Sequence, residues 1–178
     1  MSLRTVSSPV KGVSGKTLHT FLSTAQNWPR IVLSSCSVSG DGIEEPARSG
    51  GKVQEIFGVP PLLPLVVEWT CEAAIYPIIS MKSPSGVPGI AESCSMNFFV
   101  TETSEGAQVE LEMVYTPQSP LAYAAIPILA LDNSLALQVL MPSVLYSDVF
   151  IRGKGKNLWN QNTKHSIKHI LILDYLSS

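Results

Sequence analysis

The three histidines are the residues most able to carry acid–base or metal chemistry, and their spacing supports neither. His165 and His169 are four residues apart, which would place them on one face of a helix. The zinc pattern HExxH is absent, because Ser166-Ile167-Lys168 lies between them and the lysines there would repel a cation. His19 has apolar neighbours and no serine–acid pair or second ligand near it in sequence. We therefore expect no metal site and no cofactor, and a structural role for His19.

A basic run, Arg152-Gly153-Lys154-Gly155-Lys156, superficially resembles a phosphate-binding loop. It lacks the Walker spacing and the serine or threonine that follows the lysine in such loops. A solvated basic linker is therefore the favoured interpretation of this segment.

Three cysteines, Cys36, Cys71 and Cys94, form no CxxC pair, and their number is odd. This pattern predicts neither a disulfide framework nor a zinc site. All three lie in extended, mostly apolar segments, so we expect buried and unreactive thiols. Unpaired thiols also favour a soluble, intracellular protein.

Composition limits the class of protein. The 178 residues are 45% hydrophobic and 15% charged, which predicts one folded domain with its own core rather than a disordered chain. The formal charge of −2 gives no general attraction to nucleic acid, so no such partner is expected. The most hydrophobic stretch, Leu121 to Leu131, is about eleven residues long, whereas a membrane span needs roughly twenty.

The elements that must position any site begin with a strand and a helix. Leu3 to Val10 predicts an edge strand that contains Pro9. Ser14 is a candidate N-cap, and the spacing of Leu18, Phe21, Leu22 and Ala25 gives the next helix one apolar face. Trp28-Pro29 should end this helix, and Arg30 to Leu33 should add a short helical turn. Further strands are expected at residues 34–40, 52–58, 65–76, 78–82, 91–102 and 108–116.

A long apolar helix is predicted from about Pro120 to Tyr146. Pro127 should kink or split it, and Pro142 is a second breaker. The helix is apolar around much of its circumference, so we expect it to be covered on most sides or to face an apolar ligand. One late helix after a run of strands predicts an α+β fold in which an antiparallel sheet curves around the helix.

Several weak motifs together carry a family resemblance. They are Leu18-His19-Thr20-Phe21-Leu22 with Asn27-Trp28-Pro29, then Gly50-Gly51-Lys52-Val53 and Val66-Val67-Glu68-Trp69. Over residues 3–146 the chain resembles the START-like (SRPBCC) superfamily, which includes the Bet v 1-type allergens, polyketide cyclases and dehydratases, and coenzyme Q-binding START proteins. The resemblance implies a helix-grip fold, with a curved antiparallel sheet wrapped around a long C-terminal helix. It also implies a hydrophobic ligand, but no particular reaction.

A cavity between sheet and helix would take its lining from both. The expected ligand-binding residues are Phe57, Trp69 and Met113 from the strands, and Leu129, Asn133, Leu137 and Met141 from the helix. Asn133 and Glu68 could each bind a ligand oxygen, although a structural or solvent-facing role is favoured for both.

Two functions from different classes follow. The first is a non-catalytic carrier or binding protein for a hydrophobic small molecule that is lipid-like, isoprenoid or aromatic. The alternative is an enzyme of the polyketide cyclase or dehydratase kind, which would use the same cavity. In that enzyme His19, Glu68 and Tyr115 would be the candidates to move protons. The sequence leaves the choice open.

The expected domain is residues 1–146, followed by a basic C-terminal tail of residues 147–178. The tail has five lysines and arginines against two acids. Ile167, Ile170 and Leu171, with Leu173 and Leu176, could form an apolar stripe beside the lysines. Docking of this stripe on the domain is favoured over peripheral contact with a membrane surface, which stays an alternative. A role of the tail in regulation or assembly is a third possibility, and the oligomeric state is left open.

Overall fold

A computed structural model describes residues 1–58 and 64–153, and the side chains of the latter range up to residue 148. The chain divides into two compact units, Met1–Tyr146 and Ser147–Ser178. The first unit carries the sheet and the site discussed below. The predicted apolar stripe and most of the basic run lie outside the described residues.

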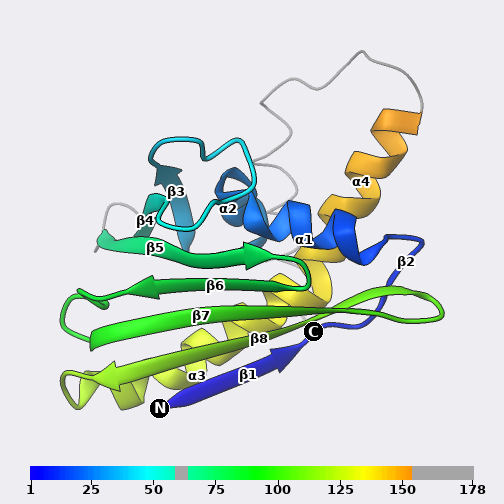
Figure 1. The fold of residues 1–178 in the computed structure, drawn as a ribbon. Coiled ribbons are helices and arrows are strands. Elements are labelled where there is room, and N and C mark those ends of the chain that lie inside the picture. The colour runs from blue at the N-terminus through cyan, green and yellow to red at the C-terminus, as the bar shows by residue number, and fades with distance from the viewer. Residues whose placement is uncertain (59–63, 154–178) are drawn as a thin grey trace. The chain divides into compact units, whose positions relative to one another are not determined.

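The first unit contains one antiparallel sheet, which has eight strands in the part of the chain that is described (Figure 1). Its order is β1-β8-β7-β6-β5-β4-β3, and β2 pairs with β8. The strands are β1 (Ser2–Val6), β2 (Val10–Lys11), β3 (Ser35–Ser39), β4 (Lys52–Phe57), β5 (Leu65–Ile75), β6 (Ile78–Ser83), β7 (Ala91–Glu102) and β8 (Gly106–Pro117). The expected edge strand from Leu3 to Val10 is divided in two around Pro9, since proline cannot donate a ladder hydrogen bond.

The hairpin of β7 and β8 shows why these segments form strands. Buried and partly exposed residues alternate along both, with Phe98 opposite Leu111 and Met96 opposite Met113 on the inner face. Gly106 closes the turn with a φ of 154°. A Cβ at this position would collide with the Val10 carbonyl of β2, so the close approach of β2 requires glycine.

The first helix begins as predicted and ends earlier. In α1 (Gly15–Ser23) the N-cap Ser14 accepts a hydrogen bond from Thr17 N at 3.2 Å. A 3-10 turn, η1 (Ala25–Asn27), then leads into α2 (Trp28–Ile31). The first helix thus ends before Trp28-Pro29, and the expected short helical turn follows but begins at Trp28 instead of Arg30. Pro29 lies in the first turn of α2, where its missing N–H costs nothing.

The long helical region continues through both of its prolines. It consists of α3 (Leu121–Leu135), the π-helical turn η2 (Ala136–Leu140) and α4 (Met141–Gly153). The predicted split at Pro127 is wrong, since Pro127 lies inside α3. The irregular turn comes later, where Met141 N donates to Ala136 O just before Pro142. A wider turn accommodates a residue without an N–H, so Pro142 does not end the helical region.

The outer face of α3 is more exposed than the sequence suggested. Leu121, Tyr123 and Ile128 are 66%, 63% and 70% exposed, so α3 is not covered on most sides. By length and composition alone, the helical run Leu121–Asp148 could cross a membrane, with a mean hydropathy of 1.6 and a third of that window buried. The core helix of a soluble protein passes the same test. The helical run is longer than the eleven-residue hydrophobic stretch, because the helix continues past Asp132 and through Pro142.

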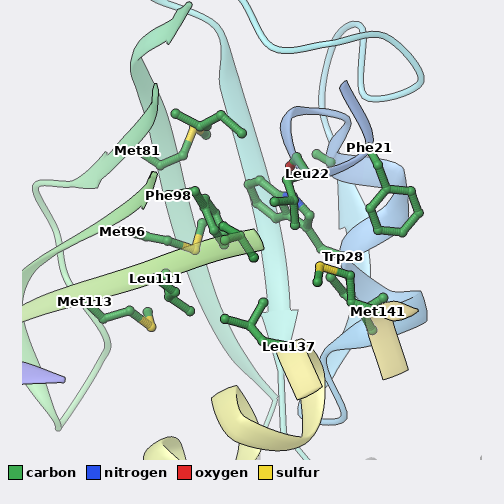
Figure 2. Close-up of a cluster of buried hydrophobic side chains, with 14 of the residues drawn as sticks. Phe21, Leu22, Trp28, Met81, Met96, Phe98, Leu111, Met113, Leu137 and Met141 are labelled. Atoms are coloured by element: carbon green, nitrogen blue, oxygen red, sulfur yellow. The ribbon is translucent and has the colours of Figure 1, made fainter. Parts of the chain in front are cut away.

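The core lies between the inner face of the sheet and the helices (Figure 2). Met81 and Met96 are buried there with Met113 and Met141, so four of the five methionines of the chain fill the interior. Cys71 and Cys94 are buried as expected, and burial raises the pKa of the Cys94 thiol to about 11. Cys36 is exposed, contrary to expectation, on an edge strand whose register shifts between Ser35 and Ser37.

Candidate functional site: a small apolar cavity with two polar residues

A cavity of about 50 Å³ lies between the sheet and the helices. Its lining is apolar except for Glu55 and Asn133. Val32 and Phe57 are the half-buried lining residues, so the cavity is closest to solvent on their side. The complete lining is Trp28, Ile31, Val32, Glu55, Phe57, Trp69, Met96, Phe98, Leu111, Met113, Asn133, Ala136 and Leu137.

The free space is small for a binding protein. At about 10–15 Å³ for each water it would hold roughly three to five waters, whereas pockets for drug-sized ligands measure roughly 300–1,000 Å³. A larger guest therefore requires lining side chains to move. Met96 and Met113 are suited to this, because methionine is unbranched and has three rotatable side-chain bonds. Figure 2 shows both side chains extending from the sheet toward the side of Leu137.

Glu55 is the acid inside this cavity. The alternation of Val53, Glu55 and Phe57 along β4 places it on the inner face, where it is 3% exposed. Its Oε2 accepts a hydrogen bond from Trp69 Nε1 at 2.9 Å. Burial raises the pKa of Glu55 to about 7, and the negative charge of Asp132 adds to this, while Ser35 and Trp69 favour the charged form. The carboxyl is therefore about half protonated near neutral pH.

Asn133 contributes the second polar group, from α3. Its Nδ2 donates to Met113 Sδ at 3.4 Å, and the Tyr115 hydroxyl donates to the same sulfur at 3.2 Å. A thioether is a weak acceptor, so the buried amide is poorly satisfied. Within the described residues its side chain makes no other hydrogen bond. Burial raises the pKa of Tyr115 above its usual range, so this hydroxyl stays a donor.

Asp132 fixes α3 beside the cavity. Its carboxylate accepts hydrogen bonds from Leu33 N at 3.0 Å and Ser34 N at 3.3 Å, and from the Ser34 hydroxyl. All three donors belong to the connection between α2 and β3. This connection is thereby tied to the helix turn that carries Asn133.

Five of the seven predicted ligand-binding residues line the cavity, namely Phe57, Trp69, Met113, Asn133 and Leu137. Leu129 and Met141 do not. Leu129 packs at the edge of the core, and Met141 is fully buried beyond the irregular turn, which changes the helix face that the sequence periodicity predicted. Ligand binding by any of the seven stays a prediction.

The proton-moving residues proposed for an enzyme do not reach the cavity. Glu68 is half exposed and forms an ion pair with Lys52 at 3.4 Å, so it does not line the cavity, where it could have bound a ligand oxygen. His19 Nε2 is 3.2 Å from Ile78 O, and its ring meets that of Tyr76 edge-on. Tyr115 is buried next to the cavity without lining it. The residue of the cavity that sequence reasoning missed is Glu55. The sequence feature that could have indicated it is the position of Glu55 on the same strand face as the apolar residues Val53 and Phe57.

Comparison with solved structures shows the fold. A Thermus thermophilus protein, TTHA0849, aligns with a TM-score of 0.64 and 13% identity over 83% of this chain and 99% of its own. Ginseng major latex-like protein 151 from Panax ginseng gives 0.51 and 13% over 72% and 90%. The di-domain ARO/CYC BexL from the BE-7585A biosynthetic pathway gives 0.52 and 18%, over 75% of this chain but 41% of the BexL chain.

No family model and no curated protein matches the sequence. The structural neighbours confirm the fold that the resemblance in the sequence implied: the chain has a helix-grip fold, with an antiparallel sheet and a long C-terminal helix.

Proposed function

We propose that this protein binds a hydrophobic small molecule between its sheet and α3, without transforming it. The observation that carries the proposal is the cavity itself, which is apolar on all sides apart from Glu55 and Asn133. Burial of apolar ligand surface there would contribute about 25 cal/mol per Å² before the costs of association. A lipid-like, isoprenoid or aromatic ligand fits this lining.

The size of the cavity limits how such a ligand enters. We infer that the ligand takes the place of methionine side chains, which swing aside as it binds. The methionines in the core support this inference, because their rotamers are easily exchanged at low cost. A hydrophobic ligand larger than the free space can then still bind between the sheet and α3.

A matched pair of substitutions tests this function. Ala136→Leu adds three carbons to the cavity wall, whereas Ala124→Leu adds the same atoms on the exposed face of α3. We expect Ala136→Leu to reduce the affinity for a hydrophobic fluorophore such as 1-anilinonaphthalene-8-sulfonate at least tenfold, while Ala124→Leu binds like the original protein. Circular dichroism confirms that both are folded, since overpacking costs about 1–3 kcal/mol. Equal affinity in both variants would contradict binding at this cavity.

A second function, catalysis of the polyketide cyclase or dehydratase kind, is supported by Glu55. An acid with a pKa near 7 inside an apolar cavity can give and take a proton at neutral pH. Glu55→Gln would then abolish turnover of a poly-β-ketone while leaving its affinity nearly unchanged. If the original protein shows no turnover of such a substrate, catalysis is ruled out and ligand binding is the one function that stays proposed.

Peripheral membrane contact through residues 147–178 stays a proposal for the tail. Residues 154–178 lie outside the described part of the chain, so the support for it is the sequence alone. Deletion of residues 154–178 should lower binding to anionic vesicles if the proposal is correct.

A further inference from the structure

We propose that Glu55 and Asn133 form a paired donor site that selects apolar ligands carrying a carbonyl-type oxygen. The inference rests on the proposed function, since it assigns the ligand class of that same cavity. Glu55 comes from β4 and Asn133 from α3, so one polar group projects from the sheet and the other from the helix.

Glu55 is oriented before any ligand arrives. Trp69 Nε1 donates to Oε2, which fixes the carboxyl and leaves Oε1 as the oxygen able to carry a proton toward a guest. Ser35 Oγ lies near enough to favour the charged carboxylate, but among the described residues it has no partner at hydrogen-bond geometry. A buried polar group held in this way at the wall of an apolar cavity is a ready donor.

Asn133 supplies the second donor. Its amide is 8% exposed, and its side-chain partner is a thioether sulfur that the Tyr115 hydroxyl already contacts. A ligand oxygen is a much better acceptor than sulfur, so the amide gains by exchanging Met113 for the ligand. The same exchange releases Met113 to move, which is the motion that enlarges the cavity.

A neutral acceptor fits better than a ligand amine. The carboxyl of Glu55 is surrounded by apolar side chains and faces the negative charge of Asp132 from α3, and both favour its protonated form. Cys94, from β7, also interacts with Glu55, and its thiol stays neutral through this pH range because its pKa is about 11. A protonated carboxyl donates a hydrogen bond to a carbonyl oxygen, whereas binding of an ammonium group would require the ionised carboxylate.

The experiment compares two molecules of nearly equal shape, cyclohexanone and methylenecyclohexane. Cyclohexanone has a carbonyl oxygen where methylenecyclohexane has a CH₂ group, which cannot accept a hydrogen bond. Binding is followed by NMR through the Trp69 indole N–H signal. We expect the affinity for cyclohexanone to fall roughly tenfold between pH 6 and pH 8, as Glu55 loses its proton, and that for methylenecyclohexane to stay constant.

Three variants complete the test. Glu55→Gln keeps a donor and an acceptor for Trp69, so cyclohexanone binding should become independent of pH. Asn133→Leu should weaken cyclohexanone roughly three- to tenfold and leave methylenecyclohexane unchanged or improved. Glu68→Gln, on the outer face, is the control and should change neither.

Different results overturn different claims. If neither molecule binds and no hydrophobic fluorophore binds either, the proposed function fails and the donor site with it. If both molecules bind, and Asn133→Leu and pH affect them equally, the cavity binds ligands but the donor site is wrong. Tighter binding of cyclohexylamine than of cyclohexanone, rising with pH between 6 and 8, would also overturn the donor site in favour of a carboxylate–amine pair.

Discussion

Glu55 is the residue on which most of the chemistry of this interior depends, and its protonation should be visible in stability. Its pKa is about 7 in the folded chain against 4.5 as the ordinary value. The folded state therefore holds the proton more tightly, and stability falls as pH rises from about 4.5 through 7. In Glu55→Gln this part of the pH dependence should be absent.

The measurement is urea unfolding of both proteins at pH 5 and pH 8. The loss of unfolding free energy between the two pH values should be larger in the original protein than in Glu55→Gln, by up to about 3 kcal/mol. Glu68→Gln, at an exposed ion pair, provides the control and should follow the original protein. Parallel pH profiles for the original protein and Glu55→Gln would mean that Glu55 is already ionised at pH 5 or still neutral at pH 8.

The same residue shows how far sequence reasoning reaches. Its alternation with Val53 and Phe57 placed all three on one face, and the structure agrees. Alternation alone does not determine whether a strand face that carries an acid points toward the core. The sequence therefore pointed to Glu68, and not to Glu55, as an acid that could bind a ligand oxygen. The hydrogen bond from Trp69, on the neighbouring strand β5, lowers the cost of burying Glu55. Trp69 is fourteen residues away along the chain, so no local sequence pattern indicates this hydrogen bond.

At the scale of elements, the attachment of α3 to the connection between α2 and β3 should be a point of cooperative stability. Asp132→Ala removes the acceptor of three hydrogen bonds and leaves Leu33 N and Ser34 N without their partner. We expect a loss of about 2–4 kcal/mol of unfolding free energy, measured by urea denaturation. Asp41→Ala, in an exposed loop, should stay within about 0.5 kcal/mol of the original protein. A loss below 1 kcal/mol in Asp132→Ala would contradict the attachment.

Elements with a strong local pattern were predictable, and those shaped by packing were not. The strand β7 and the N-cap Ser14 follow directly from alternation and capping chemistry. Pro127 and Pro142 were expected to interrupt the late helix, but Pro127 lies on the exposed side of α3 and a π-helical turn precedes Pro142. Tertiary contacts such as the hydrogen bond from Gln138 to Val6 O hold this helix against the sheet, and a local pattern does not contain them.

For the whole molecule, the fold can be predicted from the sequence, whereas the size of the cavity cannot. The order of strands and one long late helix predicts the helix-grip arrangement, which the structural neighbours share at 11–18% identity. The cavity of about 50 Å³ depends on how four buried methionines and their neighbours pack, and composition does not determine this. The division into a ligand-binding domain and a basic tail stays a prediction about function, although the chain does separate into compact units at residue 146.

Native mass spectrometry of the gently purified full chain tests the central claim most directly. The account predicts a species heavier than the 19.2 kDa chain by one small hydrophobic molecule, which is released on denaturation and extracted into organic solvent. The Ala136→Leu variant, prepared in parallel, should carry much less of it than Ala124→Leu. A bare chain mass in every preparation, together with no uptake of added hydrophobic molecules, would show that the interior is filled by its own side chains and would contradict the account.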